Sequence, residues 1–284
     1  MRFALADVDA AGRLPKLFRM AVPIHVVDAF TTEAFRGNPA GVVVTDAPLA
    51  PALLPKIAAE MRNSETAFAV PAADGSYALR WLTPTTEVDL CGHATLATAH
   101  VLRETGRVAE DATIRFQTRS GTLTAGPGPR GMLELDFPAL PVSAPTLTAE
   151  LGPALGVPIA EVWQARSDLL VVTSSELHVR EARPDFRALL ALPMRAVILT
   201  ARCDDRTVDF VSRFFAPSVG VDEDPVTGSA HCALAPFWAA RLGRNALTGV
   251  QCSARGGVVG VETVGARVKL RGHARTILRG ELLV

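Results

Sequence analysis

The strongest constraint on the fold of this chain is a local pattern that occurs twice. Residues 80–95 and residues 213–230 each read as an apolar strand, a turn with proline and acidic residues, and a helix opening marked by glycine and alanine. The openings align over three positions, Gly92-His93-Ala94 and Gly228-Ser229-Ala230. A further glycine follows each opening glycine at one spacing (121 − 92 = 29 and 257 − 228 = 29). Two landmarks at one spacing predict an internal duplication.

Each half places its strands around one alanine-rich helix, at residues 94–103 and 227–241. Because the pattern lacks an alternating βαβ rhythm, we predict the α+β class with two pseudo-symmetric domains. Each domain is expected to be a sheet or barrel wrapped on its central helix, with the pocket between the domains. A segment punctuated by three prolines, at positions 138, 141 and 145, predicts the boundary. It gives an extension at 1–20, an N-terminal domain at 21–138 and a C-terminal domain at 139–275.

Local patterns supply the other expected elements. Residues 36–41 contain arginine, glycine, asparagine and proline and predict a turn before the apolar strand at residues 42–44. A short helix is expected near residues 148–155. Residues 66–70 predict a buried strand, so Glu65 stands where the chain enters a core. Because carboxylates are seldom buried without a partner, Glu65 is a candidate functional group.

The charge balance argues against nucleic-acid and membrane partners. The 284 residues include 29 basic and 29 acidic ones, so the net charge is zero and a small-molecule ligand is expected. No apolar run approaches the ~18 residues that span a bilayer, and residues 1–20 lack the apolar segment of a secretory signal. Met20 is a second candidate start. The four cysteines lack metal-binding spacing and predict reduced thiols, hence a cytoplasmic protein.

The two helix openings are candidate anion sites. The first four N–H groups of a helix have no internal partner, and the helix dipole places about half a positive charge there. Pseudo-symmetry would direct both openings, at Gly92 and Gly228, toward one cleft. The alternative is that these glycines only permit tight turns and close helix packing.

Four side chains near these openings have both a structural and a chemical interpretation. Glu65 is either a carboxylate bonded to backbone or a general acid/base whose pKa is raised by burial. His93 is either a satisfied buried imidazole or a group that orients substrate and shares protons. Asp224 either caps the following helix or bonds a ligand amine or His93. Cys91 is a structural thiol or a reactive thiolate. A metal site formed by Cys91, His93 and His231 lacks zinc-like spacing.

Four separated motifs resemble those of the PhzF-like family of phenazine biosynthesis. They are Val27-Asp28-Ala29-Phe30 with Phe35-Arg36-Gly37-Asn38-Pro39-Ala40-Gly41-Val42, then Asn63-Ser64-Glu65-Thr66-Ala67-Phe68, Asp89-Leu90-Cys91-Gly92-His93-Ala94-Thr95, and Glu223-Asp224-Pro225-Val226-Thr227-Gly228-Ser229-Ala230. The resemblance extends from about residue 22 to the C-terminus. It implies a diaminopimelate-epimerase-like architecture and a homodimer. It also implies that the final strand, at residues 276–284, returns to the first domain.

The resemblance also implies an isomerase mechanism without metal or organic cofactor. Glu65 would move a proton between carbons of a small carboxylate-bearing substrate, which in the family is a cyclic dihydro-hydroxyanthranilate. His93 and Asp224 would be its catalytic partners. Substrate contacts are expected from Ser64, Gly92, Ala94, Gly228, Ser229 and Ala230. Racemases of the same fold use one cysteine from each domain; Cys91 matches the first, and Pro225 stands where the second is expected.

Two other functions remain open on the sequence. One is an amino-acid epimerase or racemase in which Cys91 works with Glu65 or water. The other is a small-molecule binding protein that kept the cleft without catalysis. The substrate and the pathway are not specified by any motif.

Overall fold

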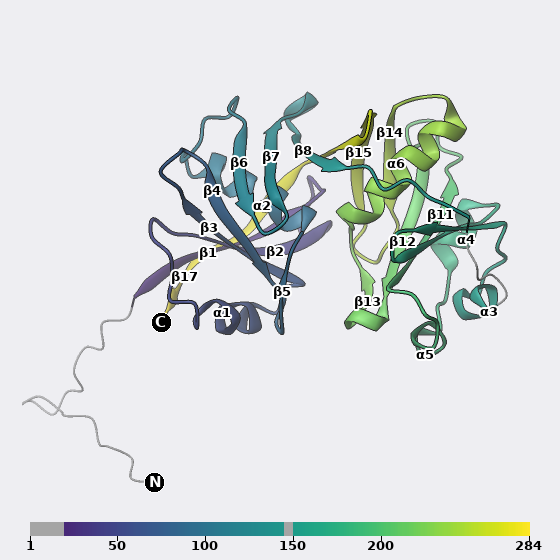
Figure 1. Cartoon of the computed structure of the whole chain (residues 1–284), viewed down its shortest axis with the longest axis horizontal. Helices are drawn as coiled ribbons and strands as arrows, with labels where there is room; N and C mark the ends of the chain where they lie inside the picture. The colour runs from purple at the N-terminus through teal and green to yellow at the C-terminus, as the bar shows by residue number, and fades with distance from the viewer. Residues whose placement is uncertain (1–19, 145–149) are drawn as a thin grey trace, which may run out of the picture.

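The computed structural model describes residues 20–144 and 150–284, so most of the predicted extension at 1–20 and the start of the predicted helix at 148–155 lie outside the described residues. Two α+β halves lie side by side (Figure 1). The first half contains β1 (Ala21–Ala29), β2 (Asn38–Val44), α1 (Leu54–Met61), β3 (Glu65–Pro71), β4 (Tyr77–Leu82), β5 (Glu87–Val88), α2 (Gly92–Glu104), β6 (Ile114–Thr118), β7 (Gly121–Pro127) and β8 (Leu133–Pro138).

The second half contains a matching series of elements. They are α3 (Leu151–Leu155), β9 (Glu161–Ala165), β10 (Asp168–Val172), α4 (Glu176–Glu181), α5 (Phe186–Leu190), β11 (Ala196–Arg202), β12 (Phe210–Ala216), β13 (Val221–Asp224), α6 (Gly228–Leu242), β14 (Ala246–Gln251), β15 (Gly257–Val264) and β16 (Arg267–Gly272). The last strand, β17 (Ala274–Leu283), follows them. None of the helices in the described ranges is long and apolar enough to cross a membrane.

Strand pairing shows that the two halves repeat one topology. In the first half β2 is parallel to β3, β3 is antiparallel to β4, and β4 pairs with β5 and in parallel with β6. In the second half β10, β11, β12, β13 and β14 pair in the same order and directions. Hairpins β6–β7 and β14–β15 then follow α2 and α6. The duplication and the α+β class predicted from the sequence are confirmed.

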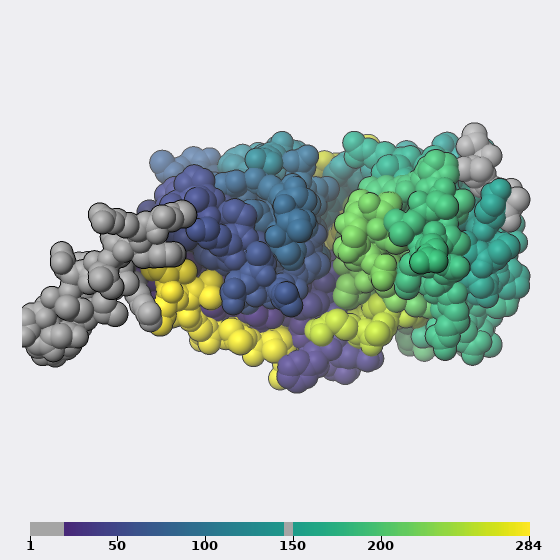
Figure 2. Space-filling model, turned by 90° about the horizontal axis from the view of Figure 1, so that it is seen from below, coloured from purple at the N-terminus to yellow at the C-terminus, as the bar shows by residue number. Residues whose placement is uncertain are grey.

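Two further strand pairs join segments that are far apart in the sequence. β8 pairs antiparallel with β16, from Pro138 opposite Arg267 to Leu133 opposite Gly272, so one sheet runs across both halves. β17 pairs antiparallel with β1, with Ala21 opposite Leu283 and Ala29 opposite Ala274. Figure 2 shows the start of the described chain (purple) and its end (yellow) along one edge, and a furrow where the halves meet. The boundary at residue 138 stays a prediction, because the sheet itself is continuous.

The two central helices are buried because alanine and other apolar residues cover most of their surface. In α2, nine of thirteen residues are buried, and in α6 ten of fifteen are. A helix that is apolar all round belongs in a core rather than at a surface. Their openings are therefore held at fixed positions by the surrounding strands.

An arginine–glutamate pair joins the two strands that precede each central helix. Arg80 of β4 donates through Nε and Nη2 to both carboxylate oxygens of Glu87, at 2.8 and 2.7 Å. Arg213 of β12 donates in the same way to Glu223, at 2.7 and 2.9 Å. Such two-point contacts fix the relative placement of two strands. In the second half the contact holds β13, whose last residue is Asp224.

Several local predictions were wrong. Residues 38–41, predicted as part of a turn, begin β2 and pair with β1, because Asn38 and Pro39 follow directly on a left-handed Gly37 that completes the turn earlier. Helices α4 and α5 were not predicted, since each is only five or six residues long and shows no full period. The acidic stretch before α6 contains the short strand β13 as well as a turn.

Candidate active site

The openings of α2 and α6 meet at the junction of the two halves. A Cβ atom added to Gly92 would lie 3.4 Å from the Cα of Gly228, and one added to Gly228 would lie 3.3 Å from the Cα of Gly92. The N-cap residues are Cys91 and Thr227, and within the described chain neither makes the usual side-chain cap hydrogen bond. Two helix N-termini with uncapped N–H groups therefore converge on one region, as an anion site requires.

Glu65 and His93 lie together on the first half's side of this region. Glu65 is the first residue of β3 and His93 the second residue of α2. The Oε2 atom of Glu65 lies 3.3 Å from Nε2 of His93, and their side chains are 19% and 6% exposed. Burial raises the pKa of Glu65, against hydrogen bonds from Ser64 and Cys91 that lower it. Burial lowers the pKa of His93, so the imidazole is favoured over the imidazolium.

Asp224 lies on the second half's side, at the end of β13. Its Oδ2 accepts a hydrogen bond from the hydroxyl of Thr227, and its backbone oxygen accepts one from Nε2 of Gln251 at 2.7 Å. Gln251 Oε1 in turn accepts the N–H of Thr227 at 2.9 Å. Burial raises the pKa of Asp224, while His93 and Thr227 lower it. Sequence reasoning missed Thr227 and Gln251, since neither belongs to a recognisable acid/base pattern.

Asn38 joins the two sides. It opens β2, is fully buried, and its Nδ2 donates to Oδ1 of Asp224 at 2.9 Å while lying 3.3 Å from Nδ1 of His93. The sequence left open whether Asp224 caps the following helix or bonds a ligand amine or His93; in the structure the Asn38 amide contacts both Asp224 and His93. The signal that could have identified Asn38 is its place in a Gly-Asn-Pro-Ala-Gly motif, which we interpreted as a turn and as one of the family-like motifs without assigning Asn38 a role.

The predicted substrate contacts fall into two groups. The hydroxyl of Ser64 lies 3.3 Å from Nε2 of His93 and faces the same region. Ala94 and Ala230 are 0% and 1% exposed, so both residues are enclosed by the protein and their predicted contact with substrate stays a prediction. Ser229 is half-buried, on the first turn of α6. The structure thus brings Glu65, His93 and Asp224 together around the two openings.

Comparison with known proteins decides the family. A family model described as phenazine biosynthesis-like protein matches residues 27–280. The chain belongs to the PhzF-like family. An uncharacterized isomerase of Pseudomonas aeruginosa is 49% identical over 263 residues, which cover 93% of this chain and 99% of that protein. This PhzF-like chain is therefore an enzyme of an isomerase family, and the resemblance inferred from its motifs is confirmed.

Solved structures confirm the fold of this PhzF-like chain. A PhzF family protein of Enterococcus faecalis superposes with a TM-score of 0.89 at 44% identity, over 93% of this chain and 100% of that one. A hydroxyproline epimerase of Agrobacterium vitis superposes with a TM-score of 0.61 at 12% identity, over 94% of each chain, and shares the fold alone. The epimerase-like architecture with two pseudo-symmetric halves is thus established.

The residue that matches Cys91 in the second half of this PhzF-like chain is Thr227, and the expectation of Pro225 was wrong. Cys91 is the N-cap of α2 and Thr227 the N-cap of α6, while Pro225 lies two residues earlier. A hydroxyl, which donates to Oδ2 of Asp224, therefore stands at the position where a second thiol was considered. Burial raises the pKa of Cys91 well above its ordinary value, and nearby Glu65 raises it further. Cys91 is thus held as a neutral thiol.

Glu65, Cys91 and His93 offer ligand atoms within 4.8 Å of one another, which raises the question of a metal. Cys91 Sγ lies 3.5 Å from Nδ1 and 4.0 Å from Nε2 of His93. A sulfur at similar distances from both ring nitrogens lies beside the ring, away from the direction of either lone pair. A metal at 2.0–2.1 Å from one nitrogen and about 2.3 Å from the sulfur requires a different placement, so this geometry does not favour a metal centre.

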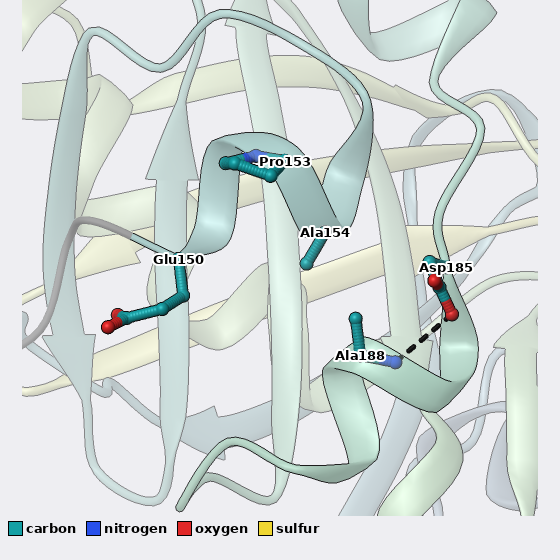
Figure 3. Close-up of a pocket in the computed structure, with 5 residues that line it drawn as sticks. All are labelled: Glu150, Pro153, Ala154, Asp185 and Ala188. Atoms are coloured by element: carbon teal, nitrogen blue, oxygen red, sulfur yellow. Dashed lines mark hydrogen bonds between the residues drawn. The ribbon is translucent and has the colours of Figure 1, made fainter.

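A hollow of 420 Å³ lies elsewhere in the second half, beside α3 and α5 (Figure 3). Asp185, which lines it, already accepts the N–H groups of Arg187 and Ala188 as the cap of α5. Glu150 points away from the other labelled side chains. Among the lining residues that the structure describes, no two polar groups converge on one point, so the helix openings remain the candidate site.

Proposed function

We propose that Glu65 moves a proton between two carbon atoms of a small carboxylate-bearing metabolite. The observation that carries this proposal is the placement of Glu65, which is mostly buried and lies 3.3 Å from Nε2 of His93, beside the paired helix openings. Burial raises the pKa of Glu65 above its ordinary value, which makes its protonated state more accessible than that of an exposed carboxyl group. That property suits a group that must act first as a base and then as an acid.

The reaction has two balanced steps. The Glu65 carboxylate takes a proton from one substrate carbon, and the electron pair of that C–H bond moves into the adjacent unsaturated system. The protonated Glu65 then returns the proton to another carbon, so substrate and product have the same composition. The N–H groups at the starts of α2 and α6 hold the carboxylate of the substrate. His93 and Asp224 are the catalytic partners, and Ser64 and Ser229 supply polar contacts.

Isotope exchange tests the proposal. A dihydro-hydroxyanthranilate, the substrate that the family resemblance implies, is incubated in deuterated water with wild type or Glu65→Gln, together with a panel of small cyclic carboxylates. NMR follows deuterium at carbon. We expect exchange with the wild type and a loss of about 10²–10⁴-fold or more in the variant, because glutamine keeps the shape but accepts no proton.

The outcomes separate the alternatives. Undiminished exchange in Glu65→Gln would assign the transfer to another group. Binding without exchange by the wild type would support the non-catalytic binder. The thiol racemase is disfavoured by the neutral state of Cys91 and by Thr227 at the matching position.

The proposal includes a homodimer. Within the described ranges β17 pairs with β1 alone, and it carries Leu278 and Leu283, which are 48% and 60% exposed. A long edge strand with apolar side chains is a surface that another chain can cover. Light scattering of the purified protein measures the mass of the particle, and a mass of one chain, 30.1 kDa, would exclude the dimer. The cytoplasmic location stays a prediction.

A further inference from the structure

Asn38 is surrounded by acceptors. Its Nδ2 atom lies 2.9 Å from Oδ1 of Asp224, 2.9 Å from the backbone oxygen of Val226, and 3.3 Å from Nδ1 of His93. The side chain is fully buried, so these contacts are not shared with solvent. Two of the partners belong to the second half of the chain and the third belongs to α2, so one amide connects both halves of the site.

The orientation of the Asn38 amide follows from these partners. A carboxylate oxygen and a backbone carbonyl oxygen accept hydrogen bonds and cannot donate them. If the amide were turned over, its Oδ1 atom would face both oxygens at 2.9 Å, and three acceptors would meet without a proton between them. In the observed orientation Oδ1 points to the hydroxyl of Ser64, at 3.5 Å. The nitrogen therefore faces His93 Nδ1.

Nδ1 of His93 is consequently in contact with a group that can only donate. The Asn38 amide nitrogen donates and cannot accept. The two protons of this nitrogen go to the oxygens of Asp224 and Val226 at 2.9 Å, so a proton on Nδ1 would face the nitrogen without finding an acceptor. Because the neutral imidazole carries one proton, that proton belongs on Nε2, which lies 3.3 Å from both Glu65 Oε2 and Ser64 Oγ.

We propose that Asn38 is a positioning residue that fixes His93 in the neutral tautomer with its proton on Nε2, facing Glu65. The functional part of this inference rests on the proposed role of Glu65. The Nε2–H group donates to the Glu65 carboxylate, which holds that carboxylate in one orientation toward the substrate. In the other tautomer a bare Nε2 lone pair would face a carboxylate oxygen, and the two would repel.

His231 provides an internal contrast. Its Nδ1 atom lies 2.8 Å from the backbone oxygen of Thr227, which can only accept, so the proton of neutral His231 is on Nδ1. The two helices thus hold histidines in opposite tautomers. Both are buried, at 5% and 0% exposed, which keeps them neutral near pH 7. His231 therefore serves as an internal reference for the tautomer that we predict for His93.

The test is nitrogen NMR of the full chain labelled with ¹⁵N-histidine at pH 7. The two tautomers differ in which ring nitrogen has the shift of a protonated nitrogen. His93→Gln and His231→Gln identify the signals by their loss. We expect Nε2 of His93 and Nδ1 of His231 to be the protonated nitrogens in wild type. A protonated Nδ1 in His93 would overturn the inference, and this measurement requires neither a substrate nor a variant of Asn38.

Asn38→Ala tests the cause, with Asn245→Ala, at an exposed position, as the control. We expect the Asn38 variant to show a mixture of His93 tautomers while His231 is unchanged, and exchange activity to fall by about tenfold or more, as when a residue that orients a catalytic histidine is removed. An unchanged His93 tautomer in Asn38→Ala would overturn the assigned cause. A shifted tautomer together with an active Glu65→Gln would leave the Asn38 assignment intact and would reject the proposed role of Glu65.

Discussion

Gly92 and Gly228, one from each half, stand with their backbones in contact, since a methyl group on Gly228 would reach within 3.3 Å of the Cα of Gly92. Both are the first residues of their helices. The pseudo-symmetry axis implied by the repeat therefore passes between two glycines. Side chains at both positions would occupy the same space.

A double-mutant cycle measures this contact. Gly92→Ala and Gly228→Ala alone are each expected to change the free energy of unfolding by less than about 1 kcal/mol, because the added contacts are only slightly tight and alanine favours the helix. The double variant should lose about 0.5–3 kcal/mol beyond the sum of the two. Urea unfolding of the four proteins gives the coupling. Additive effects would show that the openings are further apart.

The stability of Glu65→Gln is expected to depend on pH. Burial raises the folded-state pKa of Glu65 above its ordinary value of 4.5. The stability contributed by the protonated group is fully present below pH 4.5 and is lost as the pH rises through the folded pKa. Glutamine does not titrate. The variant should therefore unfold at a higher temperature than wild type at pH 8, with the difference shrinking toward pH 4.

Thermal unfolding between pH 4 and pH 8 tests this expectation, and for a chain of this length each 1 kcal/mol shifts the midpoint by roughly 2–4 °C. Asp224 and His93 titrate in both proteins, so the difference between the two curves reports mainly on Glu65. A stability difference between variant and wild type that does not grow in favour of the variant from pH 4 to pH 8 would contradict the raised pKa.

Cys91 is expected to be unreactive. Its side chain is only 7% exposed and burial raises its pKa, so little thiolate is available to attack iodoacetamide. Half-buried Cys252 should be alkylated first. Mass spectrometry of peptides during the reaction gives the order. Cys91→Ser, which keeps a donor beside His93, should retain exchange activity within about tenfold of wild type; complete loss would favour the thiol racemase.

The two arginine–glutamate pairs are expected to differ in their contribution to stability. Arg213 is 11% exposed and also donates to the backbone oxygen of Ala182 at 2.9 Å, whereas Arg80 is 43% exposed. Arg213→Met should reduce the free energy of unfolding by about 3 kcal/mol, because it leaves the mostly buried Glu223 without its partner. The matched Arg80→Met should cost less than about 1 kcal/mol, since Arg119 still pairs with Glu87 at 2.7 Å.

Urea unfolding of both methionine variants provides the comparison. Equal losses of unfolding free energy would mean that the greater burial of Arg213 adds nothing to the stability that its pair with Glu223 contributes. A drop in exchange activity confined to Arg213→Met would further show that the pair positions β13 and Asp224.

The internal repeat was sufficient to predict two similar halves, because each half has the same helix opening with glycine and alanine at matched positions. Glu65 was identifiable for a local reason: a carboxylate directly precedes a run of buried apolar residues. The helix openings and the position of Glu65 both depend on residues that are adjacent in the chain, so the sequence alone was enough to identify them.

Asn38, Thr227 and Gln251 could not be assigned in the same way. Their partners lie far away in the sequence, as with Asn38 and Asp224, and only the assembled sheets bring them together. Asn38 also stands in a motif typical of turns, and the strand pairing with β1 overrides that local preference. Helices α4 and α5 were missed because one turn and a half of helix shows no period.

The pairing of β17 with β1 has a consequence during protein synthesis. β1 begins at Ala21, and its partner residues end at Leu283, next to the C-terminus. Domains near the N-terminus usually fold while the ribosome is still at work. Here β1 lacks its β17 partner until the second half has been synthesised. Throughout translation of the second half this edge of β1 is therefore unpaired, and an unpaired strand edge is a site where another nascent chain can pair.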